Sequence, residues 1–308
     1  MTQADRSFLL PPGPPAATLT RRGLLKAGIG LTGAAGLIGS GTGAYAAMEA
    51  ANNLVITGYR VSPPGWPAGR RLTITAIADL HAGGPNMGLA RVRQVVDAGN
   101  ALGSDLVVIL GDYFATHKFV TEHVPNEAWA DELGRLRAPL GVYSILGNHD
   151  WWYGVDGVRK ALNRVHVPLM ENDAVLVGEP GRRFWLAGIG DQIAHRLGHS
   201  RFRGEDDLPG TLKRVTTDDP VILLVHEPDI FVKVPDRVAL TIAGHTHGGQ
   251  IRLPFVPPLW APSAYGARFA YGHIVEQNRH LIVSGGLGCS QVPLRLGVPP
   301  EILHITVG

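Results

Sequence analysis

Cysteine is nearly absent from this sequence of 308 residues, with Cys289 as its single representative. An internal disulfide framework is therefore excluded, and nothing near this residue indicates an activated thiol. Charged residues are also scarce, at 18% against 45% hydrophobic ones, so a sizeable core can form and extensive disorder is excluded. No repeat or linker divides the chain beyond about residue 52, and we expect a single domain there.

Positive charge is concentrated at the N-terminus. The formal net charge is +2, but the first 46 residues carry +3, which leaves −1 on the rest of the chain. A domain so close to neutrality lacks the basic surface on which nucleic-acid binding depends. We therefore expect no nucleic-acid partner.

The N-terminal segment has the features of an export signal. After a polar, proline-rich stretch comes the arginine pair Arg21-Arg22, followed by Leu24 and Leu25. A weakly apolar run from Ala27 to Gly43 then leads to an A-x-A cleavage pattern that ends at Ala46. The segment resembles a twin-arginine signal peptide, with Leu24 where Phe is usual.

We therefore predict a signal peptide at residues 1–46 and a mature domain at 47–308. The twin-arginine translocase would export the protein to the periplasm, the cell wall or the outer face of a membrane. The alternatives are an ordinary Sec signal and a retained anchor. Seven glycines in the apolar run make a spanning helix less favourable.

Beyond residue 52, short apolar runs alternate with helical patterns, which predicts an α/β fold. We expect two sheets packed face to face as a β-sandwich flanked by helices, in four αββα layers. The predicted strands are Leu54–Val61, Leu72–Ala78, Leu106–Leu110, Val142–Leu146, Phe184–Ile189, Val221–Val225, Ala239–Ala243 and Leu281–Ser284. The predicted helices cover residues 88–100, Asn126 to about Arg137, and the stretch marked by Val158, Ala161, Leu162 and Val165.

Five predicted strands lead directly into side chains that can bind metals. These side chains are Asp79 and His81, Asp112, Asn148 with His149 and Asp150, His226, and finally His245 and His247. Each alone would be weak evidence, because a single histidine is more often a core or surface residue and Gly-Asp is usually a turn. In an open α/β sheet, however, ligands bind beyond the carboxyl ends of the strands. Five of thirteen histidines follow such ends, so together they indicate a metal site.

The motifs appear in the order Asp-x-His, Gly-Asp, Gly-Asn-His-Asp, His and Gly-His-x-His. This order resembles the signature of calcineurin-like metallophosphoesterases over about residues 72–250. The stretches at 248–254 and 284–301 resemble the secreted bacterial phosphodiesterase branch, the YkuE- and YaeI-like proteins. Asp150 stands where many members of the superfamily carry glutamate.

The resemblance implies a hydrolase with two divalent metal ions, in which a metal-bridging hydroxide attacks a phosphodiester or phosphomonoester. It implies Asp112 as the bridging ligand. Asp79, His81 and His247 would complete the first site, and Asn148, His226 and His245 the second. The mixed oxygen and nitrogen ligands suit manganese, which we expect, and also iron, zinc or cobalt.

The resemblance also implies that His149 protonates the leaving oxygen. We expect Asp150 to accept a hydrogen bond from His149, to set its tautomer and to raise its pKa. The alternative for Asp150 is an ordinary turn carboxylate.

Two other functions stay open: a pyrophosphatase acting on a nucleotide-linked lipid, similar to UDP-2,3-diacylglucosamine hydrolases, and a non-catalytic exported protein that binds metal or cell wall. The apolar, proline-rich loop Arg252–Trp260 would suit a lipid-linked or cell-envelope substrate, or it packs on the domain's own core. The stretch Trp151-Trp152-Tyr153 is either core or a wall of the site. His195, His199, Arg201 and Arg203 either approach a phosphate or belong to a solvated loop, and we interpret them as a solvated loop.

Overall fold

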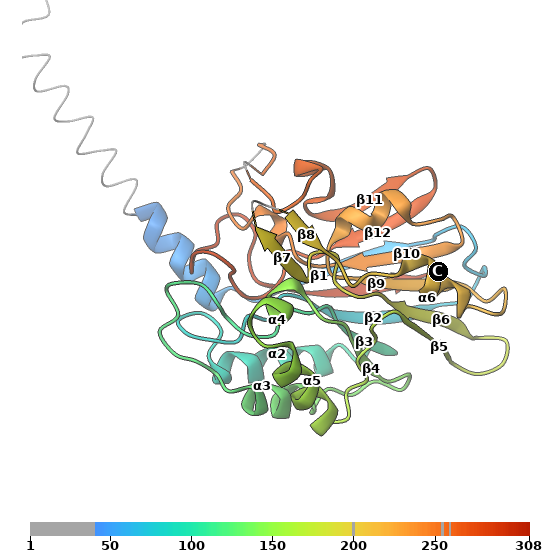
Figure 1. Cartoon of the computed structure of the whole chain (residues 1–308), viewed down its shortest axis with the longest axis horizontal. Helices are drawn as coiled ribbons and strands as arrows, with labels where there is room; N and C mark the ends of the chain where they lie inside the picture. The colour runs from blue at the N-terminus through green and yellow to red at the C-terminus, as the bar shows by residue number, and fades with distance from the viewer. Residues whose placement is uncertain (1–40, 199–200, 254–255, 259) are drawn as a thin grey trace, which may run out of the picture. The chain divides into compact units, whose positions relative to one another are not determined.

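A computed structural model describes residues 41–198, 201–253, 256–258 and 260–308 (Figure 1). The arginine pair Arg21-Arg22 lies outside the described residues. The chain divides into two compact units after Ala44. Within the part of the chain that the structure describes, no helix has the length and apolar character needed to cross a membrane.

Residues 41–52 are helical, and the second unit begins within this helix. Ala46 and Ala50 are buried. The carbonyl of Ala46 accepts a hydrogen bond from the backbone N–H of Arg295 at 3.0 Å, and the Glu49 carboxylate accepts one from Gly297 at 3.2 Å. The residues around the predicted cleavage position therefore pack against the domain, while cleavage itself stays a prediction.

Two large sheets and one small hairpin make up the β-structure. The five-stranded sheet has the order β1 (Val55–Val61), β13 (Glu301–Val307), β2 (Leu72–Ile77), β3 (Leu106–Ile109) and β4 (Val142–Ser144). The six-stranded sheet has the order β11 (Gly272–Glu276), β12 (Arg279–Val283), β10 (Val238–Ala243), β9 (Val221–Val225), β6 (Phe184–Gly188) and β5 (Asp173–Val177). The hairpin pairs β7 (His195–Gly198) with β8 (Arg201–Arg203).

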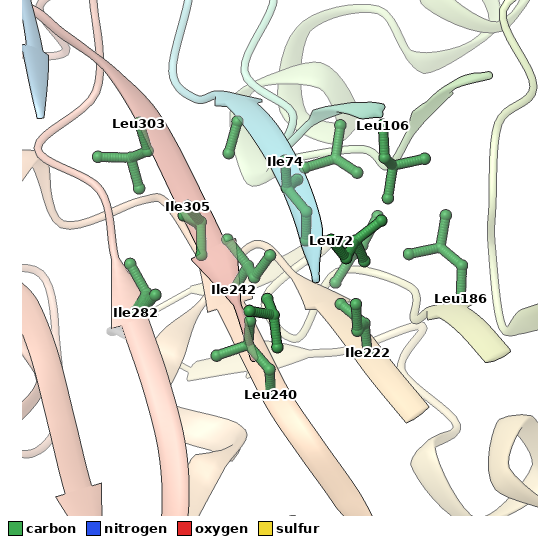
Figure 2. Close-up of a cluster of buried hydrophobic side chains, with 14 of the residues drawn as sticks. Leu72, Ile74, Leu106, Leu186, Ile222, Leu240, Ile242, Ile282, Leu303 and Ile305 are labelled. Atoms are coloured by element: carbon green, nitrogen blue, oxygen red, sulfur yellow. The ribbon is translucent and has the colours of Figure 1, made fainter. Parts of the chain in front are cut away.

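The main core lies between the two sheets, as Figure 2 shows for the aliphatic side chains that meet there. Successive residues of a strand point to opposite faces. Val108 of β3 and Ile222 of β9 accordingly face this inner core, whereas Val107 and Leu223 face the outer layers. Burial on both faces explains why these strands are continuous apolar runs rather than alternating ones.

Helices cover the outer face of each sheet. The helices α2 (Leu89–Ala101), α3 (Asn126–Leu133) and α5 (Val155–Arg164) pack on the five-stranded sheet (Figure 1). The short helices α6 (Leu208–Lys213), η1 (Pro228–Lys233) and η3 (Gly266–Phe269) pack on the six-stranded sheet. This arrangement confirms the predicted four-layer αββα sandwich.

Several boundaries differ from the prediction. The helix beginning at Asn126 ends at Leu133, before Gly134, instead of continuing to Arg137, and Asn126 is its first residue rather than its cap. Strand β13 was not predicted, although it lies inside the five-stranded sheet, parallel to β1 and antiparallel to β2. Strands β5, β7, β8 and β11 were not predicted either.

The strand directions create one functional edge. Strands β2, β3 and β4 run parallel to one another, and so do β9 and β10 in the other sheet. Two short helices begin just beyond the carboxyl ends of these strands: α4 (Asn148–Tyr153) follows β4, and η2 (His247–Gly249) follows β10.

Candidate metal centre

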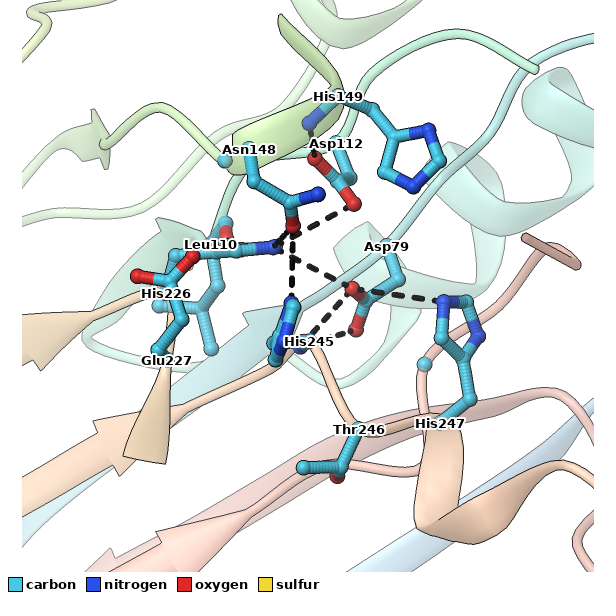
Figure 3. Close-up of polar contacts among 12 residues, drawn as sticks. Asp79, Leu110, Asp112, Asn148, His149, His226, Glu227, His245, Thr246 and His247 are labelled. Carbon is cyan, nitrogen blue, oxygen red and sulfur yellow. Dashed lines mark hydrogen bonds and ion pairs between the residues drawn. The ribbon is translucent and has the colours of Figure 1, made fainter. Parts of the chain in front are cut away.

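All seven predicted metal ligands come together beyond the carboxyl ends of these strands. Figure 3 labels six of them, all except His81. The five-stranded sheet supplies Asp79, His81, Asp112 and Asn148, while the six-stranded sheet supplies His226, His245 and His247. None of them is more than 8% exposed. The site therefore exists only where the two sheets meet, with most of its oxygen donors from one sheet and most of its nitrogen donors from the other.

The backbone at five of these ligands is left-handed. Positive φ angles occur at Asp79 (51°), His81 (42°), Asp112 (57°), His245 (71°) and His247 (52°). These are half of the ten such non-glycine residues in the described chain. The conformation costs roughly 1–3 kcal/mol per residue and concentrates at functional sites. Here it turns the chain sharply at each strand end, so that the side chains converge.

One group of donors surrounds Asp79. Its Oδ1 lies 3.8 Å from Nε2 of His247, and the Nε2 atoms of His247 and His81 are 3.2 Å apart. Ligand atoms held at about 2.1 Å from one ion are separated by roughly 3.0–3.4 Å. Asp79, His81 and His247 therefore form a group that could hold a metal ion.

A second group surrounds the amide oxygen of Asn148. This Oδ1 lies 3.2 Å from Nε2 of His226 and 2.9 Å from Nδ1 of His245. The Nδ1 of His226 lies 2.6 Å from the carbonyl of Leu110. Because Nδ1 donates to this carbonyl, Nε2 faces the site and presents its lone pair when it carries no proton.

Asp112 lies between the two groups. Its Oδ2 is 3.5 Å from Nε2 of His81 and 3.4 Å from Nε2 of His226. Its other oxygen accepts the backbone N–H of His149 at 2.8 Å. This is the position that a bridging carboxylate needs.

The charges of the site fit divalent cations. Burial raises the pKa of Asp79 to about 7, while burial lowers the pKa of His81 to about 3. Burial alone would also raise the pKa of Asp112, but the charges of His226, His149 and His81, together with a hydrogen bond from His226, outweigh it and lower this pKa well below its usual value. Two buried carboxylates, Asp79 and Asp112, attract positive charge into this site, and bound divalent cations would supply it in place of the His226 proton.

His149 faces the same centre from α4. Its ring lies 5.0 Å from the ring of His81, and its Nδ1 is hydrogen-bonded to the Thr116 hydroxyl. Burial lowers the pKa of His149, so the expected increase is wrong. Thr116, which we did not predict, is the polar partner of this ring.

Asp150 does not contact His149 as expected. Its buried carboxylate accepts backbone N–H groups of Asp112 (2.9 Å), Tyr113 (2.9 Å) and Gly147 (2.8 Å). The reason is its place in the first turn of α4, from which a carboxylate reaches back to the N-cap. Asp150 therefore joins the Asp112 turn to the Asn148 turn, and the expected hydrogen bond to His149 is wrong.

Two further contacts were missed by the sequence analysis. Glu227 lies with His226 and His245 in a group whose donor atoms are within 4.8 Å of one another. The buried Arg295 donates a hydrogen bond to Nδ1 of His247 at 3.1 Å and others to the carbonyls of Gly285 and Gly288. The 284–301 motif thus acts on the site through Arg295.

A cavity of about 910 Å³ opens above these residues. Its floor includes Asp112, Asn148, His149, His245 and His247, and its walls include Trp152, Tyr153, Arg196, Phe202 and Trp260. Trp151, in contrast, packs against the core beneath α4. Trp152 and Tyr153 are therefore a wall of the site, and Trp151 is core.

The match to known families agrees with this geometry. The model of the family "Calcineurin-like phosphoesterase" matches residues 72–249. The chain belongs to this family, and it is a metal-dependent phosphoric ester hydrolase.

Individual relatives extend the match beyond the motifs. The chain is 31% identical to "Uncharacterized metallophosphoesterase YkuE" of Bacillus subtilis, over 94% of this chain and 98% of that protein. It is 30% identical to an uncharacterized metallophosphoesterase of Aquifex aeolicus, over 86% and 95%. It is 28% identical to "Phosphodiesterase YaeI" of Escherichia coli, over 74% and 79%. The predicted likeness to YkuE and YaeI is confirmed.

Proposed function

We propose that the protein is an exported phosphodiesterase that works with two divalent ions, manganese foremost. The observation that carries this proposal is the position of Asp112, whose Oδ2 faces both His81 and His226. The bound ions would neutralise the phosphate and activate water for attack at phosphorus.

The residues of the chain divide between two ions. Asp79, His81 and His247 would hold the first, while Asn148, His226 and His245 would hold the second. Asp112 would bind both. Glu227 adds a carboxylate beside His226 and His245, and its negative charge would help to balance the charge of the second ion.

His149 is the acid for the leaving group in this proposal. In its protonated form His149 donates from Nδ1 to the Thr116 hydroxyl oxygen and carries its second ring proton on Nε2. From there it can be donated to the departing ester oxygen. Thr116 thereby takes the orienting role that Asp150 does not have.

The proposed substrate is a diester with an apolar part, either lipid-linked or derived from the cell envelope. Trp260 supports this, because it lines the cavity and is 54% exposed. Phe255, in the same loop, lies outside the described residues.

Export is supported by the Arg21-Arg22 motif, and a chain with both Arg21→Lys and Arg22→Lys should remain in the cytoplasm.

The test is metal content and turnover of the purified protein. After chelation and reconstitution with Mn²⁺, it should bind two ions per chain and hydrolyse bis(p-nitrophenyl) phosphate. His245→Ala should lose one ion and the activity. His280→Ala is a matched control, because His280 pairs with His273 at 3.0 Å outside the site. Fewer than one ion per chain would contradict the dinuclear centre, and two ions without hydrolysis of any phosphoester would indicate a binding protein.

A further inference from the structure

The hairpin β7–β8 contributes one arginine to the cavity wall. Arg196 and Phe202 are cross-strand partners, and both contact Trp152 of α4. The guanidinium carbon of Arg196 lies 3.5 Å from the centre of the Trp152 ring, and the Phe202 ring stacks on it at 5.9 Å. The hairpin thus docks on α4 through these two side chains.

Arg196 has no carboxylate partner among the described residues. Two other basic side chains of the hairpin are paired, since His195 lies 2.6 Å and Arg203 lies 3.9 Å from Glu205. A cation held on an aromatic face keeps its charge and its N–H donors, because the ring uses none of them. Arg196 is therefore fixed in place, and no acceptor among the described residues occupies its N–H donors, which can bind a ligand.

Two aromatic side chains connect the Arg196 guanidinium to His149 of the metal centre. Trp152 and Tyr153 contact both Arg196 and His149, with ring distances to His149 of 5.4 and 5.8 Å. His149 in turn belongs to the donor group of His81 and Asp112. An anion at Arg196 would thus be a second group of the substrate, separate from the phosphate at the metals.

The carboxylates that line the cavity favour the same placement. Glu227 and Asp229 are part of the lining, and Asp229 accepts hydrogen bonds from Ser263 and Ala264. These carboxylates repel an anion, so a second anionic group is directed toward Arg196. Lys118 also lines the cavity and is the competing anchor.

We propose that Arg196 binds a second phosphate of the substrate, one short alcohol unit away from the scissile phosphodiester. The substrate class is a phosphodiester in which one alcohol carries a further phosphate. This inference rests on the proposed function, because the first phosphate is placed at the metal centre. Arg196 is a positioning residue for the second one.

The test compares two ligands that cannot be hydrolysed, propylphosphonate and propane-1,3-bisphosphonate. Calorimetry on the manganese-loaded full chain should give about tenfold tighter binding of the bisphosphonate, equivalent to about 1.4 kcal/mol. Arg196→Ala and Arg196→Gln should abolish this preference, and Arg196→Lys should retain part of it. Arg203→Ala is the control, since Arg203 is on the same hairpin but outside the cavity wall, and it should keep the full preference.

Equal binding of both ligands by the wild-type protein would overturn the inference. So would a preference that survives Arg196→Ala, or one that disappears in Lys118→Ala instead. Melting temperatures of the variants show whether a loss reflects unfolding, and the glutamine variant preserves side-chain bulk. Failure of the proposed function looks different: the wild-type protein would then bind no pair of ions or would not hydrolyse bis(p-nitrophenyl) phosphate.

Discussion

The floor of the cavity and its rim are built in different ways. The floor consists mostly of buried side chains that directly follow paired strands, several of them on left-handed turns, as at Asp112 and His247. The rim, by which we mean the walls of the cavity, consists of side chains from α4, a hairpin and a loop. Among them, Phe202 and Trp260 are 41% and 54% exposed. The floor is thus fixed by the fold, and the rim by a few side-chain contacts. We expect changes in the floor to abolish the reaction and changes in the rim to alter substrate choice.

The largest effect is expected from Asp112→Asn in the floor. Removing the carboxylate charge that both donor groups share should release both ions and reduce activity by roughly 10⁴-fold or more. Metal analysis and turnover of a small chromogenic diester measure this. Asp97→Asn, which changes an exposed helical carboxylate paired with Arg135, should do neither. Two retained ions in Asp112→Asn would show that the floor does not depend on this bridge.

His149 lies where the floor and the rim meet, and we expect His149→Ala to reduce activity less than Asp112→Asn does. The variant should keep both ions but turn over a diester with a poor leaving group roughly 10²–10⁴-fold more slowly. A good leaving group needs less protonation, so nitrophenyl esters should be affected less. Thr116→Val should cause a weaker loss of the same kind. Loss of the metals in His149→Ala would make it a ligand and contradict this role.

Low pH should weaken metal binding in the floor of the cavity, because protons compete with the ions for the ligand atoms. Burial raises the pKa of Asp79 to about 7, so this carboxylate holds a proton below that pH and must release it when an ion binds. Burial lowers the pKa of His226, but the charges of Asp112, Glu227 and Asp79 and a hydrogen bond to Asp112 together outweigh it and raise this pKa. His226 must therefore also release a proton when an ion binds. The dissociation constant for Mn²⁺ should therefore increase about tenfold from pH 7 to pH 6. Calorimetry at pH 6, 7 and 8 would reveal an unchanged affinity if these protons do not compete.

The smallest effect is expected from Trp260→Ser in the rim. For a diester with an acyl or polyprenyl tail, KM should increase by about three- to tenfold, since part of one aromatic surface is lost. Turnover of bis(p-nitrophenyl) phosphate should stay the same. Phe119→Ser is a matched control, because Phe119 is equally exposed at 54% but lies outside the cavity lining. Equal losses on both substrates would assign Trp260 a structural role.

The same division explains what the sequence could reveal. The floor was predictable because each ligand directly follows an apolar strand, and parallel strands end at a common edge. The rim was not, because residues 195–203 lack apolar periodicity and the contact of Arg196 with Trp152 joins positions far apart in the chain. No local pattern encodes such a contact.

Two errors had local signals. The spacing from Gly147 to Asp150 is that of a helix N-cap followed by an acidic residue in the first turn, which predicts a carboxylate that turns back to the backbone. Strand β13 has Leu303, Ile305 and Val307 in alternation, which is a strand pattern. Its central position in the sheet depends on pairing with the distant strands β1 and β2, and alternation alone does not specify partners.

The meeting of both sheets at one centre gives the ions a second role as cross-links. Bound ions would connect ligands as far apart in the sequence as Asp79 and His247. The chain, with its single cysteine, has no internal disulfide that could make such a connection. Ions that bind only the folded chain stabilise it by mass action, to an extent set by their affinity and concentration. Ion binding would thus act as a staple between the two halves of the sandwich, and resistance to unfolding would report how fully the enzyme is loaded with metal.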